Sequence, residues 1–512
     1  MSEGVLTPTS STDALAHPLR ARALPIETAG EAMIFMHEDC PVARSEGFRA
    51  RVRVELVAKG RTLLATLYRA TDDLLADDEV GLPHRLMARL SLAEGDELQV
   101  RHPHPLSSLS HVRAKLYGHR LDEIRLGHII ADIADGRYSD VDIAAFVSAF
   151  AAQPAQGEET AALTRAMLAA GDRLEWNTDR VMDKHCVGGL PGNRTTPIVV
   201  SIIAAAGLTM PKTSSRAITS PAGTADAMET MAPVTLDLAA MQKVVEREGG
   251  CIVWGGSVNL SPADDVLIRI ERALDVDSDA QLVASVLSKK LAAGSTHVLL
   301  DLPVGPTAKI RSTRDADALA GLLENVARQC GLHVATVQTD GTQPVGRGIG
   351  PALEAHDVLA VLANRDDAPQ DLKARALALA AGILELSGVS RTDALHQATQ
   401  LLVEGRAESK FLAICEAQGG FKEPGRALQT REFLATRAGR VATFDNRLLA
   451  RTAKLAGAPQ RATAGIALHV KSGDLVEQGQ PLFTIHGESM GELDYAFAFA
   501  LRNSDMIRLE AQ

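Results

Sequence analysis

The order of apolar and polar residues changes character several times along the chain. Within the stretch 23–103, β-branched residues mix with charges and glycine, as in RVRVELVAKGRTLLATLYRA, which is typical of short strands. From 109 to 170 apolar residues recur at helical spacing, and the segment ending in IIADIADG stops on a glycine. The pattern therefore predicts a β-rich N-terminal domain followed by a helical one.

Strands and helices then alternate from 181 to about 360. THVLLDLPVG and LHVATVQTDG have the composition of buried strands, and DSDAQLVASVLSKKLAAG predicts a helix from Asp277 to Gly294. Such alternation favours a mostly parallel sheet with covering helices, in which ligands bind at the carboxyl ends of the strands. After about 430, GIALHVKSGDLVEQGQPLFTIHGES predicts hairpins like those of barrel-sandwich hammerhead domains.

Together these patterns predict a multidomain α/β protein. Its expected parts are a flexible N-terminus at 1–22, a β-rich N-terminal domain at 23–103, a helical domain at 107–180 that helices near 261–293 can join, a mixed or parallel-sheet α/β domain at 181–430, and a C-terminal α+β domain at 431–512 with hammerhead-like hairpins.

Composition excludes several classes of partner. The formal net charge of −11 and an aromatic content of 3% disfavour nucleic acid and anionic membranes. The longest apolar run, 197–207, is too short to span a bilayer, and the N-terminus has no signal-type apolar core. The five cysteines are scattered without a C-x-x-C pair, which argues against disulfides and zinc. A cytoplasmic protein that binds no metal is expected.

The stretch DKHCVGGLPGNRTT, at 183–196, carries the first candidate chemistry. Its glycines match neither the P-loop nor the dinucleotide-binding spacing. They nevertheless allow close backbone approach, and the helix expected from Thr195 offers free N–H groups to an anion. Lys184 adds a positive charge, and Thr196 adds a hydroxyl. The competing interpretation is an ordinary glycine turn with a capping threonine.

A second hydroxyl-rich stretch, PKTSSRAITSPAGTADAME at 211–229, also precedes a predicted helix. Thr224 is expected to cap that helix, without a capping box because the residue three positions on is Ala227. Solvated turns can be rich in hydroxyls as well. Two such loops, each placed between a strand and a helix, favour a phosphate site.

These residues resemble the thymidine/pyrimidine-nucleoside phosphorylase family over roughly 105–505. The similarity rests on DKHCVGGLPGN, KTSSRAITSPAGTAD, SVNLSPADD and SVLSKKLAAG, and KTSSRAITS is most similar to the AMP phosphorylase-like branch. The resemblance implies a helical and an α/β domain that face each other across a cleft, a C-terminal α+β domain, and a homodimer or larger homo-oligomer. It implies reversible phosphorolysis of a nucleoside, with inorganic phosphate as co-substrate and no cofactor.

The resemblance also implies roles for individual residues. Phosphate would be held by Lys184, Thr196, Ser214 and Thr224, and the base contacted by His185, with His185 also acting in catalysis, and by Ser285 and Lys289. The AMP phosphorylase-like branch adds nucleotide contacts at Gly189, Ser215, Arg216, Ala217, Ile218, Thr219, Ser220 and Lys309, and a catalytic proton donor at Asp277. Three of these have plain structural alternatives. Asp277 can be a helix cap, Lys289 a solvated helix end, and His185 a structural histidine.

Two positions depart from the family pattern. Cys186 stands where the family usually has serine, and a thiol is a weaker hydrogen-bond donor. Arg269 and Arg272 both qualify as the arginine that contacts the base.

The expected reaction converts a pyrimidine nucleoside such as thymidine to free base and (deoxy)ribose 1-phosphate. The close alternative is AMP or another nucleoside 5′-monophosphate, giving ribose 1,5-bisphosphate. Distant alternatives are a phosphoribosyltransferase and a non-catalytic nucleotide-binding protein. The set Lys184, His185, Ser285 and Lys289 argues against the non-catalytic alternative.

Overall fold

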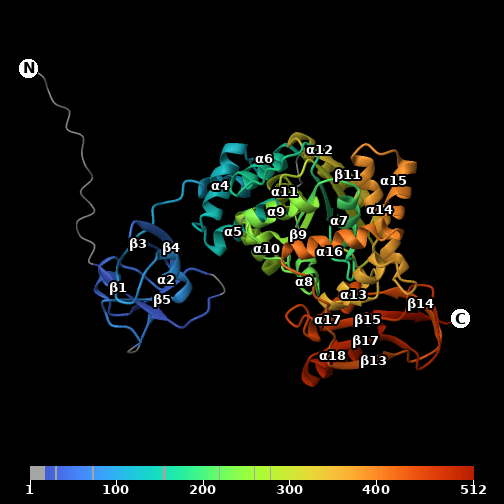
Figure 1. Ribbon diagram of the computed structural model, residues 1–512. Helices are drawn as coiled ribbons and strands as arrows, with labels where there is room; N and C mark the ends of the chain where they lie inside the picture. The colour runs from blue at the N-terminus through green and yellow to red at the C-terminus, as the bar shows by residue number, and fades with distance from the viewer. Residues whose placement is uncertain are drawn as a thin grey trace, which may run out of the picture. The chain divides into compact units, whose positions relative to one another are not determined.

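The computed structural model describes residues 18–28, 31–71, 74–153, 157–217, 220–258, 260–276 and 278–511. The chain forms two compact units (Figure 1). One unit ends at Gln153 and also takes in Val266–Val276, and the other holds the rest of the described chain. Over these residues, no helix has the length and apolar character needed to cross a membrane.

The β-rich stretch of the first unit is a closed six-stranded barrel in the order β1-β5-β2-β4-β3-β6. Its strands are β1 Leu19–Leu24, β2 Met33–His37, β3 Arg53–Ala58, β4 Arg61–Ala70, β5 Glu79–Pro83 and β6 Glu97–Arg101, and the short helices α1 Pro41–Ser45 and α2 His84–Leu90 accompany them. Ile34, Leu56, Leu67 and Leu82 are fully buried and fill the barrel. Closure removes the unpaired strand edges that would otherwise invite association.

The first unit also contains the helices α3 Leu109–Leu116, α4 Glu123–Ala134 and α5 Asp140–Ala151, together with most of α10 Pro262–Leu274. Each of α4 and α5 begins behind a capping side chain. Asp122 accepts from the N–H of Arg125 at 2.9 Å, and Ser139 forms a reciprocal capping box with Asp142. The capping residues in the sequence therefore determine where these two helices begin.

Parallel strands organise the α/β part of the second unit, as the alternating pattern predicted. One sheet has the order β11-β10-β7, and β8 pairs with β9; every pairing is parallel, and a bridge between Val181 and Thr209 links the two sets. The strands are β7 Met182–Cys186, β8 Met210–Ser214, β9 Gly250–Trp254, β10 His297–Val304 and β11 His333–Asp340.

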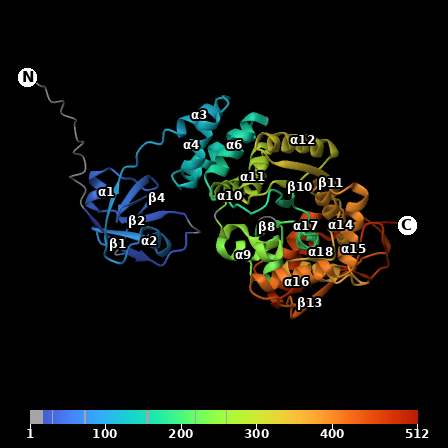
Figure 2. The same ribbon diagram turned by 45° about the horizontal axis from the view of Figure 1, so that its top comes forward.

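Helices surround these strands (Figure 2). They are α6 Gly157–Ala169, α7 Thr195–Ala205, α8 Thr224–Glu229, α9 Leu238–Glu248, α11 Asp279–Ala292, α12 Thr313–Gln329, α13 Pro351–Leu362, α14 Gln370–Leu386, α15 Arg391–Val403 and α16 Arg406–Gln418. Helix α7 is apolar on all sides because it packs against α14 and α16 as well as the sheet. Ile198, Ile202 and Ile203 are each fully buried there, and each contributes about 1.5–3 kcal/mol. The apolar run after the glycine loop is thus the central core helix.

Two helix starts differ from the sequence-based expectation. Helix α11 begins at Asp279 behind Ser278, whose hydroxyl accepts from Gln281 N at 3.5 Å, so its first helical residue lies two positions beyond the expected one. Helix α8 is capped at Gly223, and Thr224 is its first helical residue. Asp226 therefore occupies the third helical position and accepts from Gly223 N at 2.8 Å, a capping contact that was expected to be missing. A shift of one residue at the cap accounts for the error.

The C-terminal part has two antiparallel sheets, in the orders β12-β15-β17-β13 and β16-β14-β18 (Figure 1). Its elements are β13 Gln429–Leu434, β14 Gly439–Phe444, α17 Asn446–Leu455, β15 Gly465–Leu468, β16 Leu475–Val476, β17 Pro481–Gly487, α18 Met490–Arg502 and β18 Ile507–Glu510. The short strand β12, Gly348–Ile349, comes from before α13 and pairs with β15. The approach is close, because a Cβ on Gly465 would lie 2.1 Å from the carbonyl oxygen of Ile349.

Candidate active site

The predicted phosphate loop leaves the carboxyl end of β7 and runs directly into α7. Strand β7 pairs in register with β10, and the N–H of Val187 continues this pairing by donating to the carbonyl of Asp301 at 2.8 Å. Gly192 has a φ of +71°, and a Cβ there would lie 2.2 Å from the carbonyl oxygen of Val345. Only glycine fits this turn. The loop is therefore held against the body of the unit at a place where parallel sheets present ligands.

Lys184 is the buried cation of the loop. Its side chain is almost fully enclosed, with 1% relative exposure, and its Nζ donates to Thr195 Oγ1 at 2.7 Å. Burial lowers the pKa of Lys184, and the carboxylate of Asp301 partly opposes this shift. An enclosed ammonium beside a helix start is a strong place for an anion to bind.

Two predicted phosphate residues are buried hydroxyls. Thr196 lies in the first turn of α7 with 6% exposure, and Ser214 ends β8 with 8%. Ser214 Oγ is enclosed and has no hydrogen-bond partner among the residues that the structure describes. Buried hydroxyls normally have a partner, so this one is suited to a ligand oxygen.

Arg194 joins the loop after β7 to the loop after β8. Its guanidinium donates to Thr224 Oγ1 at 2.7 Å and to the carbonyl of Ala222 at 2.9 Å, and it pairs with Glu354 of α13 at 2.6 Å. Glu354 is 1% exposed, and burial raises its pKa although Arg194 opposes the shift. This arginine was not predicted as a site residue. Its place directly before two threonines at a helix start was the only signal.

The predicted base-side residues lie on β7 and α11. His185 follows Lys184, and Ser285 and Lys289 are separated by one turn of α11. Burial lowers the pKa of His185 well below its usual value, and the nearby ammonium groups of Lys290, Lys212 and Lys289 add to this shift. The imidazole is therefore neutral at physiological pH.

Lys289 is not an unpaired helix end. Its Nζ lies 2.5 Å from Asp264 Oδ2, and the Asp264 side chain is 1% exposed. The positive charge of Lys289 also contributes to lowering the pKa of His185.

The loops after β7 and β10 also meet. Gly189 has a φ of +92°, and a Cβ there would lie 3.9 Å from Lys309 N. Lys309 is exposed, in the segment that follows β10. The predicted contacts Gly189 and Lys309 are therefore neighbours.

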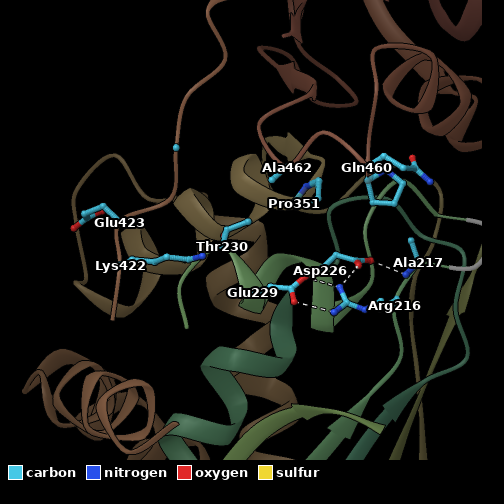
Figure 3. A pocket seen from close by; sticks show the side chains of 12 residues that line it. Arg216, Ala217, Asp226, Glu229, Thr230, Pro351, Lys422, Glu423, Gln460 and Ala462 are labelled. Carbon is cyan, nitrogen blue, oxygen red and sulfur yellow. Dashed lines mark hydrogen bonds and ion pairs between the residues drawn. The ribbon is translucent and has the colours of Figure 1, made fainter. Parts of the chain in front are cut away.

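The segment after β8 is tied down internally. Arg216 pairs with Glu229 through two contacts of 2.5 and 2.8 Å, and Asp226 accepts from Ala217 N at 2.6 Å (Figure 3). Ser215 is exposed, and Ser220 donates to the carbonyl of Ala222. Ile218, Thr219 and Asp277 lie outside the described residues.

A cavity of about 620 Å³ lies beside this segment (Figure 3). Its lining is made of Arg216, Ala217, Asp226, Glu229, Thr230, Pro351, Lys422, Glu423, Gly425, Pro459, Gln460 and Ala462. Arg216 and Ala217, two of the residues implied for nucleotide contacts, belong to this lining, whereas none of the residues implied for phosphate or base does.

The two candidate base arginines belong to the first unit. Arg269 forms a two-pronged ion pair with Asp140, with both contacts at 2.7 Å, whereas Arg272 is exposed in the last turn of α10. The choice between them stays open.

Cys186 is a neutral thiol. Burial, aided by the nearby carboxylate of Asp301, raises its pKa, and Asn193 Nδ2 donates to its sulfur at 3.2 Å. A serine hydroxyl can accept a hydrogen bond from Asn193 in the same way and is a better donor than a thiol.

We expect Cys186→Ser to fold and to lower the phosphate KM by roughly two- to tenfold, the value of one ordinary hydrogen bond. Initial rates at varied phosphate would measure this, and a folded but inactive serine variant would contradict it.

Comparison with protein families identifies the class of protein. Residues 110–171 match the helical bundle domain of a glycosyl transferase family, and 178–408 match its a/b domain. Residues 440–505 match the pyrimidine nucleoside phosphorylase C-terminal domain. The chain belongs to this glycosyl transferase family and is a pentosyltransferase of the nucleoside phosphorylase type.

Full-length relatives support this assignment. A protein of Polaromonas sp. called "Putative thymidine phosphorylase" is 56% identical over 98% of both chains, and "Putative thymidine phosphorylase 1" of Acidovorax sp. is 58% identical over 94% of both. Among solved structures, anthranilate phosphoribosyltransferase from Thermus thermophilus is 19% identical over 60% of this chain and 98% of its own. The TM-score between the two structures is 0.49.

Proposed function

We propose that the protein catalyses reversible phosphorolysis of thymidine or another pyrimidine nucleoside, with inorganic phosphate as co-substrate and no cofactor. The relatives named thymidine phosphorylase align over nearly the whole chain, which favours this substrate over AMP. One structural observation supports it most directly. The Lys184–Thr195 contact holds the buried ammonium at the start of α7, and the Arg194–Thr224 contact joins the loop after β7 to the loop after β8.

Phosphate binding is assigned to the side of the site that is rich in hydroxyls. Lys184 supplies the charge, and the hydroxyls of Thr196, Ser214 and Thr224 donate to phosphate oxygens. Ser214 Oγ is buried and able to do so without breaking another contact in the described residues. Thr224 Oγ1 already accepts from Arg194, so its own hydrogen is available for the ligand.

Besides binding phosphate, the enzyme has to stabilise the base as it leaves. A phosphate oxygen forms a bond to the anomeric carbon while the bond from that carbon to the base nitrogen breaks. The base leaves with the electron pair and then takes up a proton. The enzyme must therefore fix phosphate on one side of the sugar and stabilise a developing anion on the other.

We assign contacts with the base to residues of β7 and α11. A neutral His185 can donate one N–H to a base carbonyl. Lys289 has three donor hydrogens, so it can remain paired with Asp264 and still donate to the base. Ser285 lies one turn away on the same helix face.

A substrate panel tests the function. With phosphate present, the full-length protein is expected to release free base from thymidine or another pyrimidine nucleoside at least tenfold faster than adenine from AMP, since about 1.4 kcal/mol of discrimination gives that ratio. Liquid chromatography of released base measures it. Base release that does not depend on phosphate, or a preference for AMP, would reject the proposal.

Lys309 provides the matched variant for this panel. Lys309 is exposed, and only the resemblance to the AMP phosphorylase-like branch implies a role for it, as a contact that we expect to serve the 5′-phosphate of a nucleotide. Lys309→Ala should therefore change phosphorolysis of thymidine by less than about twofold. A large loss with thymidine would place Lys309 in the nucleoside site instead. We further propose a homodimer or larger homo-oligomer, which light scattering would measure.

A further inference from the structure

Three buried charges pair with one another, and we call them the charge cluster: Asp183, Lys212 and Lys290. Asp183 Oδ2 accepts from Lys290 Nζ at 2.7 Å, and Asp183 Oδ1 lies 3.1 Å from Lys212 Nζ. The three side chains are 0, 6 and 3% exposed. They come from β7, β8 and α11, so the cluster ties together three elements of the α/β part.

The charges of the cluster do not balance. One carboxylate faces two ammonium groups, which leaves an excess of one positive charge inside the protein when both lysines are protonated. Burial opposes the charge of Asp183, but the two lysines together hold its pKa below the usual value. Burial lowers the pKa of Lys290 to about 7 although Asp183 counteracts this shift, so the excess positive charge is present below this pH and is lost as the pH rises above it.

A purely structural purpose does not explain the second lysine. A buried ion pair contributes little to stability even when it is balanced, and an additional buried charge costs free energy. Lys212 Nζ has one further hydrogen bond, to the carbonyl of Thr213 at 2.9 Å, and Ser295 approaches Asp183 at 3.4 Å. An unfavourable charge kept in this position points to a use in the reaction.

The cluster is adjacent in sequence and in space to the proposed site. Asp183 precedes Lys184 and His185 on β7, and it accepts from Lys184 N at 2.6 Å. Lys290 follows Lys289 on α11. Burial lowers the pKa of His185, and the positive charges of Lys290 and Lys212 lower it further, in keeping with the position of Asp183 two residues before His185 on β7.

We propose that the charge cluster is a positioning device of the reaction: Asp183 holds Lys184 and His185 in place, and the excess positive charge stabilises the base as it departs as an anion. This inference rests on the proposed phosphorolysis. The field of a fixed charge in a water-poor interior acts without reorganisation, so it favours the transition state, in which negative charge develops on the base.

The test is the dependence of the rate on the leaving group. Lys290→Met removes the excess charge and leaves Asp183 paired with Lys212. Single-turnover rates are compared for thymidine and for 5-fluoro-2′-deoxyuridine, whose base is the more acidic and needs less help to leave as an anion. We expect the rate with thymidine to fall by about tenfold or more and the rate with the fluorinated substrate by roughly threefold or less. Lys290→Arg keeps the positive charge, so the ratio of the two single-turnover rates should return towards that of the parent protein.

Controls separate this effect from damage to the fold. Lys243→Met makes the same exchange at an exposed position of α9 and should leave both rates unchanged. If Lys290→Met does not fold, Lys212→Met removes the excess charge by taking away the other lysine, and the same change in the ratio of the two rates is expected. Equal losses with both substrates, or no loss, would overturn the inference while phosphorolysis by the parent protein stands. A parent that releases no thymine with phosphate would instead reject the proposed function.

Discussion

Replacing Lys184 with alanine should lower the phosphate-dependent rate by about tenfold to a hundredfold. The basis is the loss of a charge-assisted hydrogen bond to phosphate, which contributes about 1.5–3 kcal/mol. Lys184 has 1% exposure and donates to Thr195, and the loop 187–193 that follows β7 contains no cation of its own. Steady-state rates at varied phosphate and saturating nucleoside would measure the change.

Thermal unfolding distinguishes a site residue from a structural one here. A buried ammonium costs free energy when phosphate is absent, so Lys184→Ala should not lower the melting temperature without phosphate. Added phosphate should stabilise the parent protein more than the variant. Lys243→Ala, at an exposed position, is the matched control. An unchanged phosphate dependence of the rate would remove Lys184 from the site.

Glu354→Ala is expected to produce the largest loss of stability. It would leave Arg194 enclosed at 8% exposure without its ionic partner, and breaking a buried pair in this way costs about 3–5 kcal/mol. The melting temperature should fall by roughly 6 °C or more. Differential scanning calorimetry would measure it, with Glu385→Ala on the exposed side of α14 as control.

A double variant separates stability from catalysis. Arg194→Met with Glu354→Leu removes both charges, so much of the lost stability should return. Activity should stay low, because Thr224 would lose the guanidinium that positions it. Full activity in the double variant would show that Arg194 has no part in arranging the phosphate loops, and a Glu354→Ala protein as stable as the control would disprove the buried-pair account.

The sequence predicted correctly those structural elements that depend on residues close together in the chain. Helical spacing and β-branched runs reflect which face of each element is buried, so the alternating strands and helices and their parallel sheet were predictable. The start of α7 at Thr195 was also foreseen, because glycine and threonine mark the boundary within a few residues. At α8 the same reasoning failed by one residue, since Gly223 and Thr224 both suit a cap.

Contacts between distant residues could not be predicted in this way. Arg194 and Glu354 are 160 positions apart, and Asp183 and Lys290 are 107 apart. Each of these side chains looks like an ordinary surface charge in its own segment. Only the folded chain shows that they are enclosed, and enclosure is what gives them strong mutual electrostatic effects. The candidate residues nearest the ligand were therefore easier to find than those that hold them in place.

The short strand β12 has a consequence for how the C-terminal region can be separated from the rest. Because Gly348 and Ile349 supply the outer strand beside β15, a fragment cut near 430 would expose an unpaired strand edge. Lys471 would also lose its hydrogen bonds to the carbonyls of Pro344 and Gly346. The C-terminal sheet is therefore a shared structure, and a soluble fragment or a domain exchange with a relative has to carry the segment from 344 onward along with it.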